Sequence, residues 1–161
     1  MSLLNTRANV NHLSVNILTL NLRAFINEPS TQRMNFNLTQ IPDRNLKPRQ
    51  AGITMVMDKG LSVQEAKNFM SVSYPHVDIV KLGFGTAYVT PNLEEKLEVY
   101  RAHNIPIYFG GTLFEAFLIR NQFEDYISVC QKYGIQYMEV SDGSINIPHA
   151  EKCGYVEKLA K

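Results

Sequence analysis

Cysteine is scarce in this sequence of 161 residues, which contains only Cys130 and Cys153. Both lie in helix-like stretches, and their spacing matches no metal-ligand pattern. We therefore expect two reduced, buried thiols and a cytoplasmic protein, because thiols stay reduced in that compartment.

An excess of charge of one sign and long hydrophobic runs are also missing. The formal net charge of +1 at pH 7 predicts no strong attraction to nucleic acid or to an anionic membrane surface. No stretch approaches the roughly 20 apolar residues that a membrane-spanning helix needs. We thus expect neither nucleic acid nor membrane as a partner. With 45% hydrophobic residues, the chain can form the core of one ordinary soluble domain.

Acidic residues are almost absent from the first 33 residues, where Glu28 stands among six asparagines and three arginines. Polar residues interrupt the apolar ones, which argues against a secretory signal, and asparagine disfavours the amphipathic helix of an import signal. We expect residues 1–33 to be an extension that is disordered, outside the fold or not translated. Met34 is a plausible start for a single folded domain over residues 34–161.

What the remaining sequence does contain is a repeated pattern of apolar, β-branched runs, each followed by a helix-like stretch. The runs cover residues 53–60, 77–83, 105–111 and 135–143, and the strand starts expected in them, at Ile53, Ile79, Ile105 and Ile135, are 26, 26 and 30 residues apart. Alternating strands and helices predict a parallel α/β sheet, because a parallel crossover needs a helix-sized connection. Chemistry in such folds lies at the carboxyl ends of the strands.

Helix boundary signals support this pattern. The predicted starts are a capping box at Ser62 and Glu65, an N-cap at Thr90 before Pro91, a second capping box at Thr112 and Glu115, and Pro148 before a helix over 150–160. In this interpretation Glu115 serves only as the capping partner of Thr112.

The repeat length is typical of a (β/α)8 TIM barrel, in which about 250 residues make eight units. Only the first four βα units are present in this chain. Three explanations stay open: the sequence is truncated, two copies complete a barrel, or the domain is a small open sheet of the flavodoxin type.

Strand periodicity brings two charged residues to one face of the predicted sheet. Lys81 shares a face with Val77 and Ile79, and Glu139 shares one with Tyr137 and Ser141, because side chains alternate along a strand. A lysine in an apolar strand is costly unless it is paired or binds an anion. The pair therefore predicts either an anion site or an ion pair that only stabilises the sheet.

Loops suited to anions follow three of the strands. They are Asp58-Lys59-Gly60, Gly83-Phe84-Gly85-Thr86 and Gly110-Gly111-Thr112, and glycine allows backbone amides to approach a phosphate or carboxylate closely. Lys47 and Arg49 add cations before the first strand, although a solvated loop explains them equally well. No dinucleotide fingerprint and no Walker motif is present.

Together these segments resemble the phosphosulfolactate synthase family over about residues 41–161. The matching segments are Lys47-Pro48-Arg49, Gly52 to Gly60, Val80 to Thr86, Pro91 to Lys96, Gly110 to Glu115 and Glu139 to Gly143. The resemblance implies a barrel enzyme that uses Mg²⁺ to add sulfite to phosphoenolpyruvate. The product is (R)-2-phospho-3-sulfolactate, the opening step of one route to coenzyme M, and relatives carry the fold in other roles.

For this chemistry we expect Lys81 and Glu139 to be the catalytic residues, because lysine together with Mg²⁺ is a known solution for enolate chemistry. The expected Mg²⁺ ligands are Glu139, Asp142 and Asp58. The expected substrate-binding residues are Arg49, Lys59, Gly85, Thr86, Gly110 and Gly111.

Members of this family continue beyond the point that corresponds to Lys161, with a Ser-Glu-Val-Gly segment and a nearby lysine that resembles a catalytic acid. The general acid is thus expected in an absent half. One hypothesis is a lyase represented by its amino-terminal half, and another is a non-catalytic half-barrel that is a remnant or a binding module dependent on assembly. A phosphate-binding lyase of the aldolase kind is a third. We expect a homo-oligomer or pairing with a missing half.

Overall fold

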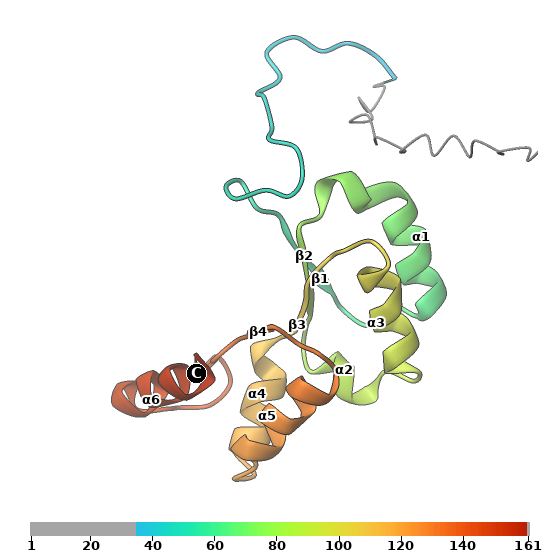
Figure 1. Ribbon diagram of the computed structural model, residues 1–161. Helices are drawn as coiled ribbons and strands as arrows, with labels where there is room; N and C mark the ends of the chain where they lie inside the picture. Colours follow the sequence, from blue (N-terminus) through green and yellow to red (C-terminus); the bar gives the residue numbers. More distant parts are fainter. Residues whose placement is uncertain (1–34, 161) are drawn as a thin grey trace, which may run out of the picture. The chain divides into compact units, whose positions relative to one another are not determined.

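The computed structural model describes residues 35–160, and the predicted extension over residues 1–33 lies outside this part of the chain. Within this part, residues 40–160 belong to one compact unit. Its centre is a sheet of four parallel strands: β1 (Met55–Asp58), β2 (Ile79–Leu82), β3 (Ile107–Phe109) and β4 (Tyr137–Met138) (Figure 1). The predicted parallel α/β sheet is confirmed, with strands inside the four apolar runs.

The strand order in space is β1-β2-β3-β4, the same as the order along the chain. Lys81 aligns with Met57 on one neighbour and with Tyr108 on the other. In a flavodoxin-like sheet the order in which strands are added reverses at a switch point, so that the first strand lies inside the sheet. In a βα barrel each strand is added beside the previous one. The observed order therefore favours the barrel arrangement over the open sheet of the flavodoxin type.

Helices connect the strands as the repeat predicts. They are α1 (Val63–Ser73), the 3-10 helix η1 (Tyr74–His76), α2 (Thr86–Val89), α3 (Leu93–Arg101), α4 (Gly111–Leu118), α5 (Phe123–Lys132) and α6 (His149–Leu159). Helices α1 and α3 contact one another beside the sheet (Figure 1). None of the helices within residues 35–160 combines the length and hydrophobicity that crossing a membrane requires.

One of the predicted helix starts is confirmed in detail and another is wrong. Ser62 caps α1, with its hydroxyl accepting from the Glu65 amide at 3.3 Å while the Glu65 carboxylate accepts from the Ser62 amide at 2.7 Å. Thr90 does not cap the next helix, because α3 begins at Leu93 with Asn92 before it. The Thr90 hydroxyl instead donates to the Thr86 carbonyl at 2.7 Å and closes α2.

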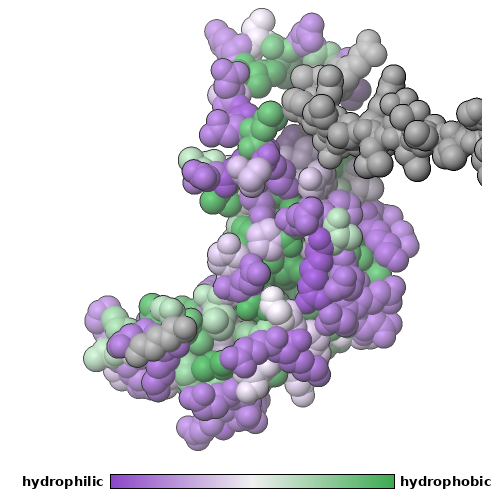
Figure 2. All heavy atoms as spheres, in the orientation of Figure 1, coloured by the Kyte–Doolittle hydropathy of each residue, from purple (hydrophilic) through white to green (hydrophobic). Residues whose placement is uncertain are grey.

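The two faces of the sheet differ in burial. On one face, side chains such as Val80, Leu82 and Phe109 are buried in a core that the helices supply. On the opposite face, Met55 is 45% exposed and Tyr137 is 50% exposed. Hydrophobic residues also reach the molecular surface between hydrophilic ones in the space-filling view (Figure 2). The second face of the sheet is hence available for polar chemistry.

The two cysteines also differ in burial, so half of the thiol prediction is wrong. Cys130 is buried in α5 as expected, where burial raises the pKa of its thiol despite the nearby Tyr126 hydroxyl. Cys153 is exposed on α6, 3.6 Å from the imidazole of His149. The helical pattern around Cys153 was real, but its position on the exposed side of the helix could not be read from spacing.

Candidate functional site

Lys81 and Glu139 form an ion pair on the more exposed face of the sheet. The Lys81 Nζ atom lies 2.6 Å from Glu139 Oε2 and donates a hydrogen bond to Oε1 at 2.9 Å. Lys81 belongs to β2, and Glu139 follows β4, two residues after Tyr137 on the same face. The side chains are 16% and 32% exposed, so solvent reaches both. The predicted convergence of these two side chains is confirmed.

Tyr108 of β3 lies between the two strands that carry this pair. Its ring centre is 5.9 Å from Lys81 Nζ. Burial raises the pKa of the Tyr108 hydroxyl, the Lys81 charge lowers it and the Glu139 charge raises it, with a net upward shift. The hydroxyl therefore stays protonated near neutral pH and can donate a hydrogen bond to an anion.

The glycines that open α4 pack directly against the pair. A Cβ atom on Gly110 would lie 2.8 Å from Lys81 Cε, and one on Gly111 would lie 3.0 Å from Glu139 Oε1 and 2.2 Å from Ser141 Cβ. Such distances leave no room for a side chain. The backbone at Gly110 and Gly111 thus reaches the charged groups closely, as expected. The Gly110 amide donates to the Leu82 carbonyl at 2.9 Å, and the first turn of α4 begins with the amide of Gly111.

Glu115 is a polar residue of this region whose role the sequence interpretation missed. It does not form the predicted capping box with Thr112, because α4 begins at Gly111 and has no side-chain cap. Its buried carboxylate instead accepts from the Ser141 hydroxyl at 2.5 Å and from the amides of Gly143 and Ser144 at 2.7 and 3.1 Å. The only available signal was the S/T-x-x-E pattern, which indicated the wrong partner.

Asp58 lies on the opposite face of the sheet from Lys81, so the prediction that it shares a metal with Glu139 is wrong. It is 2% exposed, its Oδ2 atom is 2.8 Å from Lys96 Nζ, and it accepts from the Tyr100 hydroxyl at 2.8 Å. Its other oxygen accepts from the amides of Gly60 and Leu61, both at 2.8 Å. Burial raises the pKa of Asp58, but these hydrogen bonds outweigh it and leave the pKa lowered.

Arg49 lies at the amino ends of the strands, so the structure does not bring it together with the other predicted substrate-binding residues at the carboxyl ends. Its guanidinium donates to Asp78 at 2.7 Å and to the Pro75 carbonyl at 2.8 Å. Asp78 precedes β2 and also accepts from the Thr54 amide at 2.8 Å. Lys47 joins the same end by donating to the carbonyls of η1 and Val77. Together these contacts fasten the segment before β1 to the sheet.

Lys59, Gly85 and Thr86 belong to the loops after β1 and β2. Lys59 Nζ lies 5.7 Å from the centre of the Phe84 ring. Gly85 has a φ of +69°, a conformation that favours glycine, and the Thr86 hydroxyl donates to the Gly83 carbonyl at 2.8 Å. An apolar groove of about 650 Å³ runs from Phe84 and Gly85 to Thr112 and Leu113 of α4. Gly85 therefore lines this groove, whereas Lys59 and Thr86 line a second recess of about 640 Å³.

Asp142 is held by α6. Its carboxylate accepts from Lys152 Nζ at 2.5 Å, and this hydrogen bond lowers the pKa of the exposed Asp142 side chain. Asp142 is therefore ionised and already paired with Lys152. Glu139 is also paired, with Lys81, but this pair lies on the more exposed face of the sheet. Among residues 35–160, no group of three His, Cys, Asp or Glu side chains is arranged to hold a metal ion.

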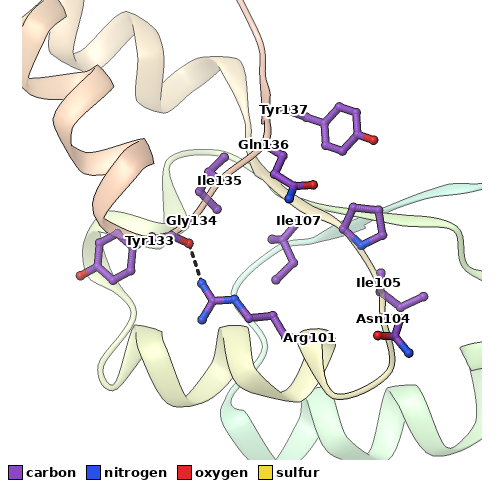
Figure 3. A pocket seen from close by; sticks show the side chains of 10 residues that line it. Arg101, Asn104, Ile105, Ile107, Tyr133, Gly134, Ile135, Gln136 and Tyr137 are labelled. Carbon is purple, nitrogen blue, oxygen red and sulfur yellow. Dashed lines mark hydrogen bonds between the residues drawn. The ribbon is translucent and has the colours of Figure 1, made fainter.

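A further cavity of about 450 Å³ lies at the amino ends of β3 and β4 (Figure 3), lined by side chains from Arg101 and Asn104 to Gln136 and Tyr137. Its arginine is already occupied. Arg101 pairs with Glu94 at 2.6 Å and with Glu98 at 2.5 Å, and it donates to the Tyr133 carbonyl at 2.5 Å. Because these contacts satisfy the guanidinium, the cavity offers no free cation for an anionic ligand.

Comparison with known proteins connects this geometry to one family. A family model described as (2R)-phospho-3-sulfolactate synthase (ComA) matches residues 42–161. The chain is 33% identical over 123 residues to a phosphosulfolactate synthase of Bacillus subtilis strain 168, covering 76% of this chain and 49% of the relative. It is 37% identical over 118 residues to the enzyme of that name from Methanothermobacter thermautotrophicus, covering 72% and 46%.

A third relative with the same name, from Methanocaldococcus jannaschii, is 34% identical over 111 residues, which cover 68% of this chain and 44% of the relative. The chain thus spans about half the length of the curated relatives that it matches.

Proposed function

The chain belongs to the phosphosulfolactate synthase family, and from this premise we propose that it supplies part of a site that adds sulfite to phosphoenolpyruvate. The observation that carries the proposal is the Lys81–Glu139 pair, which stays partly exposed at the carboxyl ends of the strands and lies against Gly110 and Gly111. A cation, an anion and close backbone amides within one region suit a substrate with several negative charges.

The proposed reaction balances as an addition. The sulfite sulfur attacks the methylene carbon of phosphoenolpyruvate and forms a carbon–sulfur bond, while the double-bond electrons move onto the carboxylate as an enediolate. One proton then adds to the neighbouring carbon and gives (R)-2-phospho-3-sulfolactate. The demands on the protein are to neutralise the enediolate and to deliver the proton on one face.

Lys81 would serve the anionic side of this reaction. Its ammonium group is held by Glu139, so a substrate phosphate or carboxylate can take over that contact without leaving the charge unpaired. A lysine whose side chain is 16% exposed can make such an exchange, whereas a lysine sealed in the core would lose its only counter-ion. Tyr108, which stays protonated and whose ring centre is 5.9 Å from Lys81 Nζ, would donate to the same anion.

Glu139 would hold Mg²⁺, a metal that favours one or two carboxylates together with substrate oxygens and water. Its Oε2 atom is buried and accepts no well-directed hydrogen bond, although Lys81 Nζ is 2.6 Å away. A metal at this oxygen would have to take the place of the Lys81 ammonium, which is its present counter-ion. When bound, the metal would stabilise the enediolate charge as a Lewis acid. Asp142 remains a second candidate ligand, which would first have to release Lys152.

The substrate-binding set is reduced to the carboxyl-end loops. Gly111 would present its backbone amide to the phosphate, whereas Gly110, whose amide already donates to the Leu82 carbonyl, would only allow the close approach. Gly85 would line one recess beside them, and Lys59 and Thr86 would line another. In this proposal the general acid comes from a segment that lies outside the residues described here.

One observation favours a second candidate, a half-barrel that works only in an assembly. Met55 and Tyr137 expose 45% and 50% of their surface on the face that carries the Lys81–Glu139 pair. Apolar side chains on an uncovered sheet face favour pairing with another polypeptide. Light scattering of the purified chain tests this candidate, since a stable monomer would contradict assembly through this face between copies.

The proposed activity is tested by measuring the consumption of phosphoenolpyruvate by the purified chain with sulfite and Mg²⁺. We expect Lys81→Ala and Glu139→Gln to lower sulfite-dependent turnover by at least a hundredfold. Lys67→Ala provides the matched control, because Lys67 pairs with Glu95 at 3.8 Å on the surface. Full activity in both site variants would refute the assignment. Binding of phosphoenolpyruvate to an inactive wild-type chain, lost in Lys81→Ala, would instead support the assembly-dependent candidate.

A further inference from the structure

We propose that Glu115 is a positioning residue that fixes the segment after β4, so that the Glu139 carboxylate meets Lys81. This inference rests on the proposed function of the same site, since Glu139 and Lys81 are its central pair. It adds a residue that would act through Glu139 and would not touch the substrate.

The hydrogen bonds of Glu115 all go to one short segment. Its carboxylate accepts from the Ser141 hydroxyl at 2.5 Å and the Gly143 amide at 2.7 Å through Oε1, and from the Ser144 amide at 3.1 Å through Oε2. These donors follow Glu139 by two to five residues. A carboxylate that accepts from several backbone amides holds a loop more tightly than a single neutral hydrogen bond does.

Close packing at Gly111 fixes the same segment at a second point. Gly111 and Glu115 are four residues apart in α4 and so lie on one face of the helix. The missing Cβ of Gly111 would come within 2.2 Å of Ser141 Cβ and 3.0 Å of Glu139 Oε1. The segment after β4 is therefore hydrogen-bonded to Glu115 and packed against the first turn of α4. These two contacts leave Glu139 little freedom to turn away from Lys81.

Glu115 keeps its charge in the core without a cationic partner in the described part of the chain. The residue is 3% exposed, and no lysine, arginine or histidine within residues 35–160 forms an ion pair with it. Burial raises its pKa, and the hydrogen bonds from Ser141, Ser144 and Gly143 lower it further than burial raises it. The ionised form thus depends on the segment keeping its conformation, and the segment depends on the ionised form.

The test is a measurement of the ion pair itself by ¹⁵N NMR of lysine ammonium groups, which become visible when a hydrogen bond slows their exchange with water. In wild type we expect separate signals for Lys81 and for Lys96, assigned by Lys81→Arg and Lys96→Met. Lys96 pairs with Asp58 on the opposite face, 2.8 Å away, and so serves as an internal control. Glu139→Gln should raise the Lys81 exchange rate at least tenfold.

Two variants distinguish the effect of side-chain length from the effect of charge at position 115. Glu115→Asp keeps the negative charge but shortens the side chain, so it should also raise the Lys81 exchange rate at least tenfold while the Lys96 signal stays unchanged. Glu115→Gln keeps the length and one acceptor and should have a smaller effect. Ser141→Ala removes a single donor and is available if the Glu115 variants do not fold. Glu124→Gln, an exposed acid at the start of α5, should leave both signals unchanged.

Retention of the Lys81 signal in every folded variant at 115 and 141 would overturn the inference, and so would its absence in wild type. Failure of the proposed function has a different signature. In that case wild type and Glu139→Gln would bind phosphoenolpyruvate equally well. They would also bind Mn²⁺, a paramagnetic probe for the Mg²⁺ site, equally well, whatever the ammonium spectrum shows.

Discussion

Replacing Asp58 by asparagine should remove a large part of this protein's free energy of unfolding. The residues of the candidate site would all remain in place. The Asp58 carboxylate faces Lys96 at 2.8 Å inside the core, where their side chains are 1% and 0% exposed. It also accepts from the Tyr100 hydroxyl at 2.8 Å. Asp58→Asn keeps the shape of the side chain but removes the charge, so Lys96 would remain buried without a counter-ion.

The magnitude follows from this burial. Removing one partner of a buried ion pair costs about 3–5 kcal/mol, because the other charge stays dehydrated. A domain of this size has a free energy of unfolding of roughly 5–15 kcal/mol, so the variant should lose a large part of its stability. With a urea dependence of about 1–3 kcal/mol per molar, the midpoint should fall by roughly 2 M.

Urea unfolding followed by circular dichroism measures this change. Glu94→Gln is the matched control, because its pair with Arg101 is largely exposed and should cost no more than about 1 kcal/mol. Asp58→Asn combined with Lys96→Met should recover most of the loss, since both charges are then gone. Tyr100→Phe removes one hydrogen bond to the carboxylate and should cost about 1.5–3 kcal/mol.

A loss below about 1 kcal/mol in Asp58→Asn would refute the reasoning from burial. An unchanged stability together with a lost Mn²⁺ affinity would show that Asp58 is a metal ligand after all. The experiment therefore distinguishes the structural role that we assign to Asp58 from the metal-binding role that its position after a strand suggested.

Two further predictions concern packing and pH. Gly111→Ala should cost about 1–3 kcal/mol in urea unfolding, because its Cβ would lie 2.2 Å from Ser141 Cβ, whereas Gly154→Ala in α6 has open space and should be neutral or stabilising. Acid should destabilise the fold, because hydrogen bonds that outweigh burial lower the pKa of both Asp78 and Glu115. Their stabilisation is present above the unfolded values of about 3.9 and 4.3 and is lost as pH falls through the folded values. Thermal unfolding between pH 7 and pH 2 should show this loss below about pH 4, and Asp78→Asn should flatten it; a melting temperature constant down to pH 2 would contradict it.

Much of the architecture could be predicted because it depends on local pattern. The four strands lie inside the apolar runs, and the Ser62 capping box is present with both hydrogen bonds. The meeting of Lys81 and Glu139 could also be predicted, because alternation places Lys81 within β2 and Glu139 directly after β4, and the strands are parallel. These features need no knowledge of how distant segments pack.

The errors arise where the partner of a polar group is distant in the sequence. Both faces of β1 are lined by apolar residues, so alternation alone could not say that Asp58 turns toward Lys96 of α3. Glu115 matched a capping box, but its partners are 26 to 29 residues away. Arg49 is a different case: a residue just before a strand lies at the amino end, so its distance from the carboxyl-end loops was available from the sequence.

The contrast between the two lysine–carboxylate pairs explains why only one of them suits chemistry. Lys96 and Asp58 are sealed in the core, and exchanging either partner would expose a bare charge to a medium that cannot solvate it. Lys81 and Glu139 are 16% and 32% exposed, so water or a substrate oxygen can replace each partner as the other leaves. Neighbouring positions in β1 and β2 point to opposite faces of the sheet. The permanent Lys96–Asp58 pair therefore lies on one face, and the exchangeable Lys81–Glu139 pair lies on the other. The candidate site therefore depends on the uncovered face, and any partner that covers this face must leave Glu139 open to ligands for the proposed reaction to proceed.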